Sequence, residues 1–363
     1  NEESTINMPL EDAVGMLRGT PDTPVSLEVM RTGWSEPHKF TLTREIINVD
    51  SVSNKSLGDG IGYVDVRNFT ANTARDVRTA LGEMSQEMGG LKGVILDLRN
   101  NPGGLLREAV ALADTFLDSG VIVTTVGEAD KMRNEERADA DYSQPSYPIV
   151  VLLNPGSASA SEVVSGALKN NRRALIVGER SFGKGSVQNL YDMFDGSALK
   201  LTISQYLTPG DVSIQGVGIV PDVQLVPVVI TDELVDLYAS DQILREGDLE
   251  THLSSSHTSQ TAERPAATIK YYMEQAEKDP DAIVDPDAFK MDVEIGIARD
   301  ILKAAGTTWE RSEMLAKAQP VIDRTASTEN RTIGERLQKL GVDWSAADNV
   351  IQPVKLEVTT DHR

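Results

Sequence analysis

The sequence predicts an α/β protein built on a mostly parallel sheet. Between residues 61 and 179, apolar runs typical of buried strands alternate with segments whose apolar residues recur at helical spacing. The runs GVILDLRN (93–100) and YPIVVLLN (147–154) are continuously apolar, which suits strands buried on both faces. Strands that alternate with helices favour a parallel sheet covered by helices. At 363 residues the chain is long enough for about two or three domains.

The first segment stands apart from this pattern. A short helix is expected over 9–18, ending at Gly19, and two alternating strands follow at 25–30 and 39–45. One helix and two strands cannot enclose a core of their own. We therefore expect this segment to be an appendage, or the C-terminal part of a domain whose first half is absent.

The remaining elements follow in order along the chain. Strands are expected at 60–69, 93–100, 121–126, 147–154, 174–179, 186–193 and 198–207, helices at 73–88, 105–118 and 161–171, and a charged loop near 127–146. After residue 230 the pattern changes to polar helices, at 287–305 and 309–340, with a linker near 251–266 and a lone strand at 354–360. The predicted domains are therefore 1–46, 47–229 and a mainly helical 230–363.

Composition excludes several classes of function. The chain has 35 Lys and Arg against 56 Asp and Glu, a net charge of −21, which disfavours binding to nucleic acid or to an anionic membrane. It contains no cysteine, and its four histidines lack the spacing of a zinc motif, so we expect no metal site and no cofactor. No apolar run is long enough for a transmembrane helix, and no signal peptide opens the chain.

Residues 154–168, NPGSASASEVVSGAL, carry the first candidate chemistry. Serines alternate with alanines where a buried strand passes into a helix. Ser159 and Glu162 have the spacing of a capping box, which is a sufficient structural explanation. A hydroxyl at a helix N-terminus also lies beside free backbone amides that can stabilise an oxyanion. Both readings of Ser159, as a cap and as a nucleophile, stay open on this evidence.

A serine nucleophile needs a base. No histidine occurs between His38 and His252, which excludes a Ser-His-Asp triad within the core. A lysine can replace histidine, and Lys184 stands between two glycines in GERSFGKGSVQ, although an exposed loop lysine is the simpler reading. The same segment nearly matches a phosphate-binding loop, but Gly185 replaces the Ser or Thr that would coordinate magnesium, and a strand follows instead of a helix.

A second glycine turn, DLRNNPGGLL at 97–106, also follows a buried strand. Its glycines can serve only to close a tight turn. Alternatively, Gly103 or Gly104 places a backbone amide close to a ligand, because glycine has no Cβ to block the approach.

Together these motifs resemble a known family. Ser159, Lys184 and Gln188 stand 25 and then 4 residues apart, as in the catalytic set of the carboxy-terminal processing peptidases, also called tail-specific proteases. The blocks LDLRNNPGG, GSASASE, GERSFGKGSVQ and YLTPGDVSIQGVGIVPDV are similar to that family's signature blocks and occur in the same order. The resemblance covers about residues 8–226.

The resemblance implies a role for each of these positions. Ser159 would be the nucleophile, Lys184 the general base and Gln188 a residue that orients the lysine, while Glu162 is explained by capping. Lys184 and Gln188 can point to one face if they share an extended strand. Backbone amides of Ala160 and Gly104, or less favourably Gly103, would form the oxyanion hole. The implied fold is a spiral α/β core similar to crotonase and Clp peptidase, preceded by the C-terminal half of a PDZ domain over 1–46.

The expected function is a serine endopeptidase that cleaves protein substrates near accessible C-termini through an acyl-enzyme. The alternative is a catalytically latent peptide-binding scaffold of the same fold. By resemblance we also expect a periplasmic location and either a homo-oligomer or an adaptor protein as partner.

Overall fold

The computed structural model describes residues 5, 8, 10–31, 34–46, 50–127, 132–142, 147–231, 234–237, 245–249, 263–274 and 289–342. The chain divides into two units, Asn1–Asp50 and Ser51–Arg363. Most of the expected linker, 251–262, and the expected strand at 354–360 lie outside the described residues.

The first unit contains the helix and the two strands that the sequence predicts. They are α1 (Leu10–Leu17), β1 (Pro24–Val29) and β2 (His38–Thr43), and the two strands pair antiparallel. The Arg44 guanidinium donates to the carbonyls of Leu17 and Pro24, at 2.8 and 3.0 Å, and so ties the helix to the hairpin. The assignment of this unit to half a PDZ domain stays a prediction.

A mostly parallel sheet forms the centre of the second unit, as predicted. Its strands are β3 (Val52–Ser56), β4 (Ile61–Val66), β5 (Gly93–Asp97), β8 (Ile149–Leu153), β9 (Leu175–Gly178), β13 (Val223–Ile230), β14 (Val235–Asp236) and β15 (Ala267–Tyr272). The order across the sheet is β14-β13-β9-β8-β5-β4-β3, with β15 also paired to β13. The pairs from β4 through β5, β8 and β9 to β13 and β15 are parallel, while β3 and β14 are antiparallel to their neighbours.

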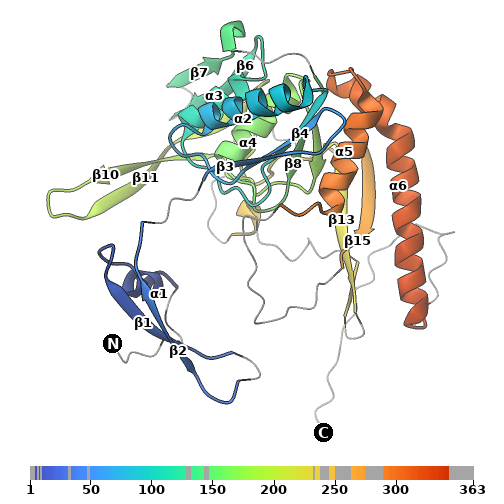
Figure 1. Ribbon diagram of the computed structural model, residues 1–363. Helices are drawn as coiled ribbons and strands as arrows, with labels where there is room; N and C mark the ends of the chain where they lie inside the picture. The colour runs from blue at the N-terminus through green and yellow to red at the C-terminus, as the bar shows by residue number, and fades with distance from the viewer. Residues whose placement is uncertain are drawn as a thin grey trace. The chain divides into compact units, whose positions relative to one another are not determined.

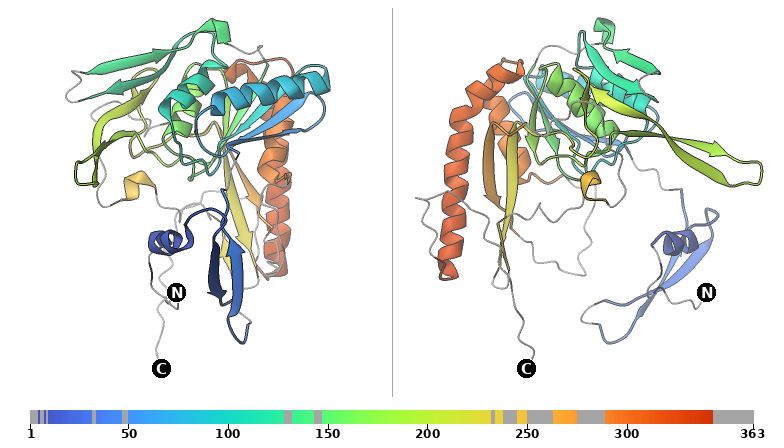
Figure 2. Two further views of the ribbon diagram at one scale, coloured as in Figure 1. Left: turned by 60° about the vertical axis from the view of Figure 1, so that its left-hand side comes forward. Right: turned by 180° about the vertical axis from the view of Figure 1, so that it is seen from behind.

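Helices cover both faces of this sheet (Figures 1 and 2). On one face lie α2 (Thr73–Met88), α3 (Leu106–Asp114) and α4 (Ala160–Asn170), and on the other lie α5 (Val293–Ala305) and α6 (Arg311–Lys339). Successive side chains of a strand point to opposite faces. Thus Val94 and Leu96 of β5 pack under α2 to α4, whereas Ile95 packs under α5. Burial on both faces explains why these strands are continuously apolar in sequence.

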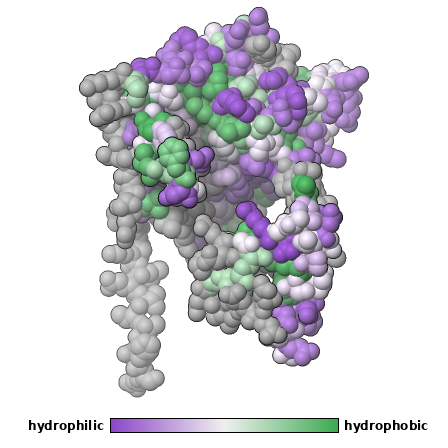
Figure 3. Space-filling model, turned by 90° about the vertical axis from the view of Figure 1, so that its left-hand side faces the viewer, coloured by the Kyte–Doolittle hydropathy of each residue, from purple (hydrophilic) through white to green (hydrophobic). Residues whose placement is uncertain are grey.

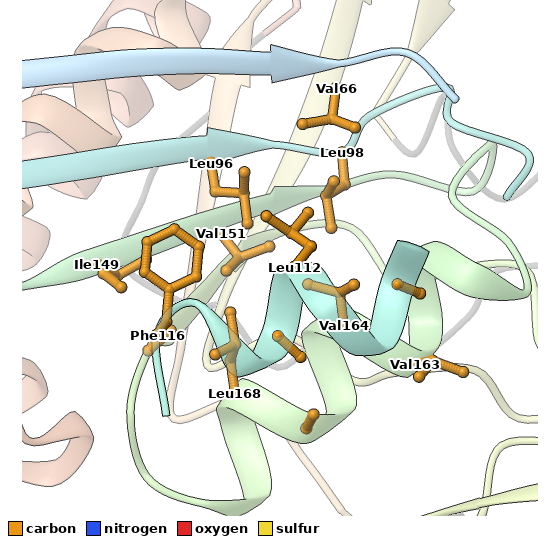
Figure 4. Close-up of a cluster of buried hydrophobic side chains, with 14 of the residues drawn as sticks. Val66, Leu96, Leu98, Leu112, Phe116, Ile149, Val151, Val163, Val164 and Leu168 are labelled. Atoms are coloured by element: carbon orange, nitrogen blue, oxygen red, sulfur yellow. The ribbon is translucent and has the colours of Figure 1, made fainter. Parts of the chain in front are cut away.

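The face under α3 and α4 holds a well-packed core (Figure 4). Leu112 and Phe116 of the α3 region and Leu168 of α4 meet Leu96 and Val151 of the sheet, and all are at most 2% exposed. Each such side chain contributes about 1.5–3 kcal/mol by leaving water. This packing fixes α4 against the sheet and therefore fixes the position of the residue at its N-terminus.

A second, antiparallel sheet lies beside the first. It consists of β7 (Arg133–Arg137), β6 (Val121–Val126), β11 (Ala198–Thr208) and β10 (Ser186–Asp192), with β12 (Val212–Ser213) paired to β11. The β10–β11 hairpin projects from the core, on the left-hand side of Figure 1. Figure 3 views the molecule from that side and shows exposed apolar residues there. The exposed apolar residues of the hairpin are Tyr191, Met193, Phe194, Leu199, Leu201 and Ile203.

Several elements differ from the sequence prediction. The expected charged loop at 127–146 contains strand β7, RNEER, whose residues are all exposed; charged residues are common on an edge strand because they prevent pairing with other chains. Strand β13 was not predicted because Pro227 interrupts its apolar run, and proline is rare inside sheets. The region after residue 230, expected to be mainly helical, also contributes β15 to the parallel sheet. Its helices α5 and α6 lie within the predicted ranges.

Candidate active site

The candidate residues lie on three loops at one edge of the parallel sheet. The loop 98–105 follows β5, the turn 154–159 follows β8, and the loop 179–185 follows β9. These three strands are neighbours in the order β9-β8-β5 and run parallel, so the loops at their carboxyl ends are adjacent. Ligands of open α/β sheets bind at this edge. The sequence expectation that the three motifs meet is consistent with this arrangement.

Ser159 occupies a strained position between β8 and α4. Its backbone dihedrals are φ 56° and ψ −110°, a region that residues with a Cβ seldom adopt. It directly precedes α4, where free amides and the positive end of the helix dipole gather. A serine on a sharp turn from strand to helix presents its hydroxyl at the end of the sheet, the geometry that serine hydrolases use for a nucleophile.

Gly103 packs directly against this turn. A Cβ on Gly103 would lie 2.8 Å from the Ala158 carbonyl oxygen and 3.0 Å from both Ala160 N and Ser159 Cβ. Its φ of +105° is also unfavourable for other residues. Gly104 is equally constrained, because a Cβ there would lie 2.2 Å from the Phe69 carbonyl oxygen. Close approach therefore requires glycine at both positions, against the Ser159 turn for Gly103 and against Phe69 for Gly104.

The amides distinguish the two glycines. The Gly103 N–H donates to Oδ1 of Asn101 at 2.9 Å, so it is already paired. Within the described residues, the N–H groups of Gly104 and Ala160 have no hydrogen-bond partner. The hydrogen bonds therefore favour Gly104 over Gly103 as the predicted oxyanion donor.

Lys184 lies on a loop held by its neighbours. The Gly185 N–H donates to Oε1 of Gln215 at 3.0 Å, and the Gly185 carbonyl accepts from Tyr206 N at 2.7 Å. A Cβ on Gly183 would lie 3.0 Å from Gly218 N, so this glycine too is set by close packing. Lys184 itself is partly buried. Among the hydrogen bonds of the described residues, none joins Lys184 Nζ to Ser159 Oγ.

Glu162 connects the serine turn to the lysine loop. Its carboxylate, fully buried, accepts from Ser159 N at 2.7 Å and Lys184 N at 2.9 Å on Oε2. Oε1 accepts from Ser181 Oγ and Gly183 N, both at 2.6 Å. Because Ser159 and Lys184 donate to the same oxygen, their backbone nitrogens can lie no farther apart than the sum of those two distances.

The role of Glu162 goes beyond the helix cap that the sequence predicts. Capping by the Ser159 and Glu162 pair is present, but three of the four donors come from a loop 19 to 22 residues away. Burial raises the pKa of Glu162 to about 7, although the four donors favour the charged form. The only sequence signal for this role is a glutamate at the third position of the helix, and capping explains that signal fully.

Gln188 is placed differently from the expectation. Lys184 lies before β10 and not on it, since β10 begins at Ser186, and the register of β10 against β11 shifts between Val187 and Gln188. The premise that Lys184 and Gln188 share one extended strand is therefore wrong. Gln188 is exposed, and its Nε2 lies 3.4 Å from Thr202 Oγ1 on β11. Its role in orienting the lysine stays a prediction from the resemblance.

Asparagines fix the remaining parts of the site. The side-chain amide of the buried Asn101 donates to the Val66 carbonyl at 2.6 Å. The backbone carbonyl of Asn101 accepts from Ala158 N at 3.0 Å and from Ser161 Oγ at 2.9 Å. Asn154 and Asn100 bond to each other through Nδ2 and Oδ1 at 2.9 Å. The loop after β5 is thus bonded to both sides of Ser159.

A buried ionic cluster supports the start of that same loop. Arg99 donates to Asp97 at 2.6 Å, contacts Asp292 at 2.9 Å and pairs with Glu294, the last two at the N-terminus of α5. Tyr271 of β15 donates to Glu294 at 2.9 Å. Elements beyond residue 260 therefore help to hold the loop that carries Gly103 and Gly104.

The described residues contain no cluster of three or more side chains that could hold a metal ion. No helix among them is long and apolar enough to cross a membrane.

Comparison with known proteins finds one family model and several relatives. Residues 60–225 match the model of peptidase family S41. A carboxy-terminal-processing protease of Bartonella bacilliformis is 40% identical over 265 residues, which cover 72% of this chain and 59% of that protein. A carboxyl-terminal-processing protease of Synechocystis is 39% identical over 60% of this chain and 51% of that protein. A solved photosystem II D1 C-terminal processing protease is 36% identical, with a TM-score of 0.47, over 60% of this chain and 59% of that one.

The chain spans between half and three fifths of the length of these two curated relatives. The matched segment contains every candidate catalytic residue, from Gly104 to Gln188. Residues 60–225 of this chain form a peptidase family S41 domain.

Proposed function

We propose that this chain is a serine peptidase in which Ser159 and Lys184 form a catalytic dyad and that cleaves protein substrates near their C-termini. The observation that carries the proposal is the strained Ser159 at the start of α4, joined to the Lys184 loop through one oxygen of Glu162. The names of the relatives, processing proteases that act at carboxyl termini, support the site of cleavage.

The chemistry follows from the groups in place. Neutral Lys184 Nζ takes the proton from Ser159 Oγ while the oxygen attacks the scissile carbonyl carbon. The N–H groups of Gly104 and Ala160 stabilise the resulting oxyanion, and the lysine then passes its proton to the leaving amine. A water molecule next gives a proton to Lys184 and attacks the ester carbonyl carbon. When the ester bond breaks, the acid product leaves and Lys184 returns the proton to Ser159 Oγ, which restores both residues.

Two substitutions test the dyad. Ser159→Ala and Lys184→Ala should each abolish cleavage of an unfolded protein substrate, because they remove the nucleophile and the base. Ser327→Ala and Lys317→Ala, both exposed on α6, are matched controls that should keep full activity. Unchanged cleavage in both site variants would overturn the mechanism.

A second candidate function is a latent peptide-binding scaffold. It is favoured by the lack of a hydrogen bond between Lys184 Nζ and Ser159 Oγ within the described structure. A fluorophosphonate probe separates the two candidates, because it adds mass to an activated serine only. Labelling of Ser159 that is lost in Lys184→Ala supports the peptidase, and no labelling under conditions of substrate binding supports the scaffold. The periplasmic location and the adaptor or oligomeric partner stay predictions from the resemblance.

A further inference from the structure

Two arginines, Arg180 and Arg245, belong to segments near the lysine loop. Arg180 and Arg245 are partly buried, and neither forms an ion pair within the described residues. The Nε atom of Arg245 is buried and has no hydrogen-bond partner. Burial and, after it, the positive charge of Arg245 lower the pKa of Arg180.

Backbone contacts place this pair beside the catalytic loop. The Glu246 N–H donates to the Phe182 carbonyl at 3.1 Å, which sets residue 245 against the segment 180–182. The Phe182 N–H in turn donates to the Ser157 carbonyl at 3.0 Å. Phe182 therefore links the segment that carries Arg245 to the turn that carries Ser159, and Lys184 follows two residues later.

The nearby carboxylates already have partners. The Glu246 carboxylate accepts from Gln215 Nε2 at 3.1 Å, and Asp248 accepts from the backbone N–H of Arg245 at 3.0 Å. Each therefore serves a polar group other than a guanidinium side chain. Two partly buried positive charges are costly without an anion, and guanidinium donors match the two oxygens of a carboxylate.

We infer that Arg180 and Arg245 bind a carboxylate of the peptide substrate beside the scissile bond. This inference rests on the proposed peptidase function. A substrate offers this chemistry from two sources, its C-terminal carboxylate and the side chain of Asp or Glu. In both cases the pair selects a substrate and holds it in register, so Arg180 and Arg245 are specificity-determining residues and take no part in proton transfer.

The test compares two pairs of peptides, and the members of each pair differ only in one charge. The first pair shares one sequence and ends in a free carboxylate or an amide. The second pair carries Glu or Gln next to the cleaved bond. With the wild type, the preferred carboxylate should lower KM about tenfold or more, the effect of one charge-assisted contact, with little change in kcat. Arg180→Gln and Arg245→Gln should remove this preference while leaving cleavage of the uncharged peptide within about twofold of wild type.

Controls separate this inference from folding and from the proposed function. Arg75→Gln, an exposed arginine on α2, should keep the preference, and Arg180→Lys should keep part of it because the charge remains without the planar fork. Binding of the same peptides to Ser159→Ala, followed by fluorescence anisotropy, reports on recognition without turnover. Equal affinity for all four peptides, or a preference that survives in both glutamine variants, would overturn the inference. A Ser159→Ala enzyme that still cleaves would instead overturn the proposed function.

Discussion

At the scale of single residues, Glu162 has the largest influence on the site. A buried carboxylate is costly, and only its four donors make it tolerable. Those donors belong to the two segments that carry the proposed nucleophile and the proposed base. Glu162 therefore positions both catalytic loops with one side chain, without contact to a substrate.

The pH dependence of stability tests this role. The pKa of Glu162 is raised from 4.5 to about 7. Between pH 4.5 and pH 7, the native state therefore holds a proton that the unfolded chain has already lost. Its contribution to the free energy of unfolding is therefore present below pH 4.5 and is lost as pH rises towards 7. This loss of unfolding free energy amounts to roughly 3 kcal/mol at most, and it should be absent in Glu162→Gln. Urea unfolding at pH 5 and pH 8 measures it.

The same variant should lose activity for a separate reason. The glutamine amide nitrogen cannot accept hydrogen bonds, so two of the four donors lose their acceptor. We expect kcat/KM to fall at every pH while Glu83→Gln, exposed on α2, behaves like the wild type in both experiments. An identical pH dependence in Glu162→Gln and the wild type would show that the carboxyl does not titrate in this range.

The sequence points to the candidate positions more clearly than to the residues that surround them. Ser159, Lys184 and Gly104 each occur in a short motif after a buried strand, so a local pattern is enough to propose them. The bonds from Glu162 to Ser181 and Gly183 cross a span that no local pattern describes. Gln188 shows the opposite problem, because simple strand geometry assumes that it shares a strand with Lys184, whereas β10 begins only at Ser186.

At the scale of elements, α5 belongs to the structure that carries the site. It lies outside the segment matched to the family, yet it packs on β5 and β8 and holds Arg99 through Asp292 and Glu294. The sequence predicts the helix from its periodicity. It does not predict the docking, because β15, a strand of the sheet whose Ile269 belongs to the same hydrophobic cluster as α5, is a short strand within a polar region.

Leu302 tests whether α5 and the core unfold together. It is 2% exposed and lies close to Gly93 at the start of β5. Leu302→Ala should lower the free energy of unfolding by about 2–5 kcal/mol, through lost burial and the cavity left behind. Its neighbour Lys303 pairs with the exposed Asp59, so Lys303→Ala should cost no more than about 1 kcal/mol. A normal core transition in Leu302→Ala, with only a small early loss of helix signal, would show that α5 is independent.

At the scale of the whole molecule, charge acts in two ways over different distances. The net charge of −21 repels acidic chains and attracts basic ones from beyond contact distance. The pair Arg180 and Arg245 acts only after a substrate has arrived, at a partly buried position where salt screens charges less. Overall charge therefore governs how often the enzyme and a substrate meet. The proposed arginine pair governs the position in which the bound peptide is held.

Salt dependence separates these two effects. Raising ionic strength from about 0.01 M to 1 M shortens the screening length from roughly 30 Å to 3 Å. For a basic unfolded substrate we expect kcat/KM to fall about tenfold or more, because electrostatic attraction to the acidic surface is lost; for an acidic substrate it should rise. An uncharged substrate of equal length controls for effects of salt on the enzyme itself. The ratio of kcat/KM between carboxylate and amide peptides should change far less, since that preference arises at the arginine pair. If the ratio collapses in parallel with the basic substrate, both effects come from the overall charge and the local pair contributes nothing.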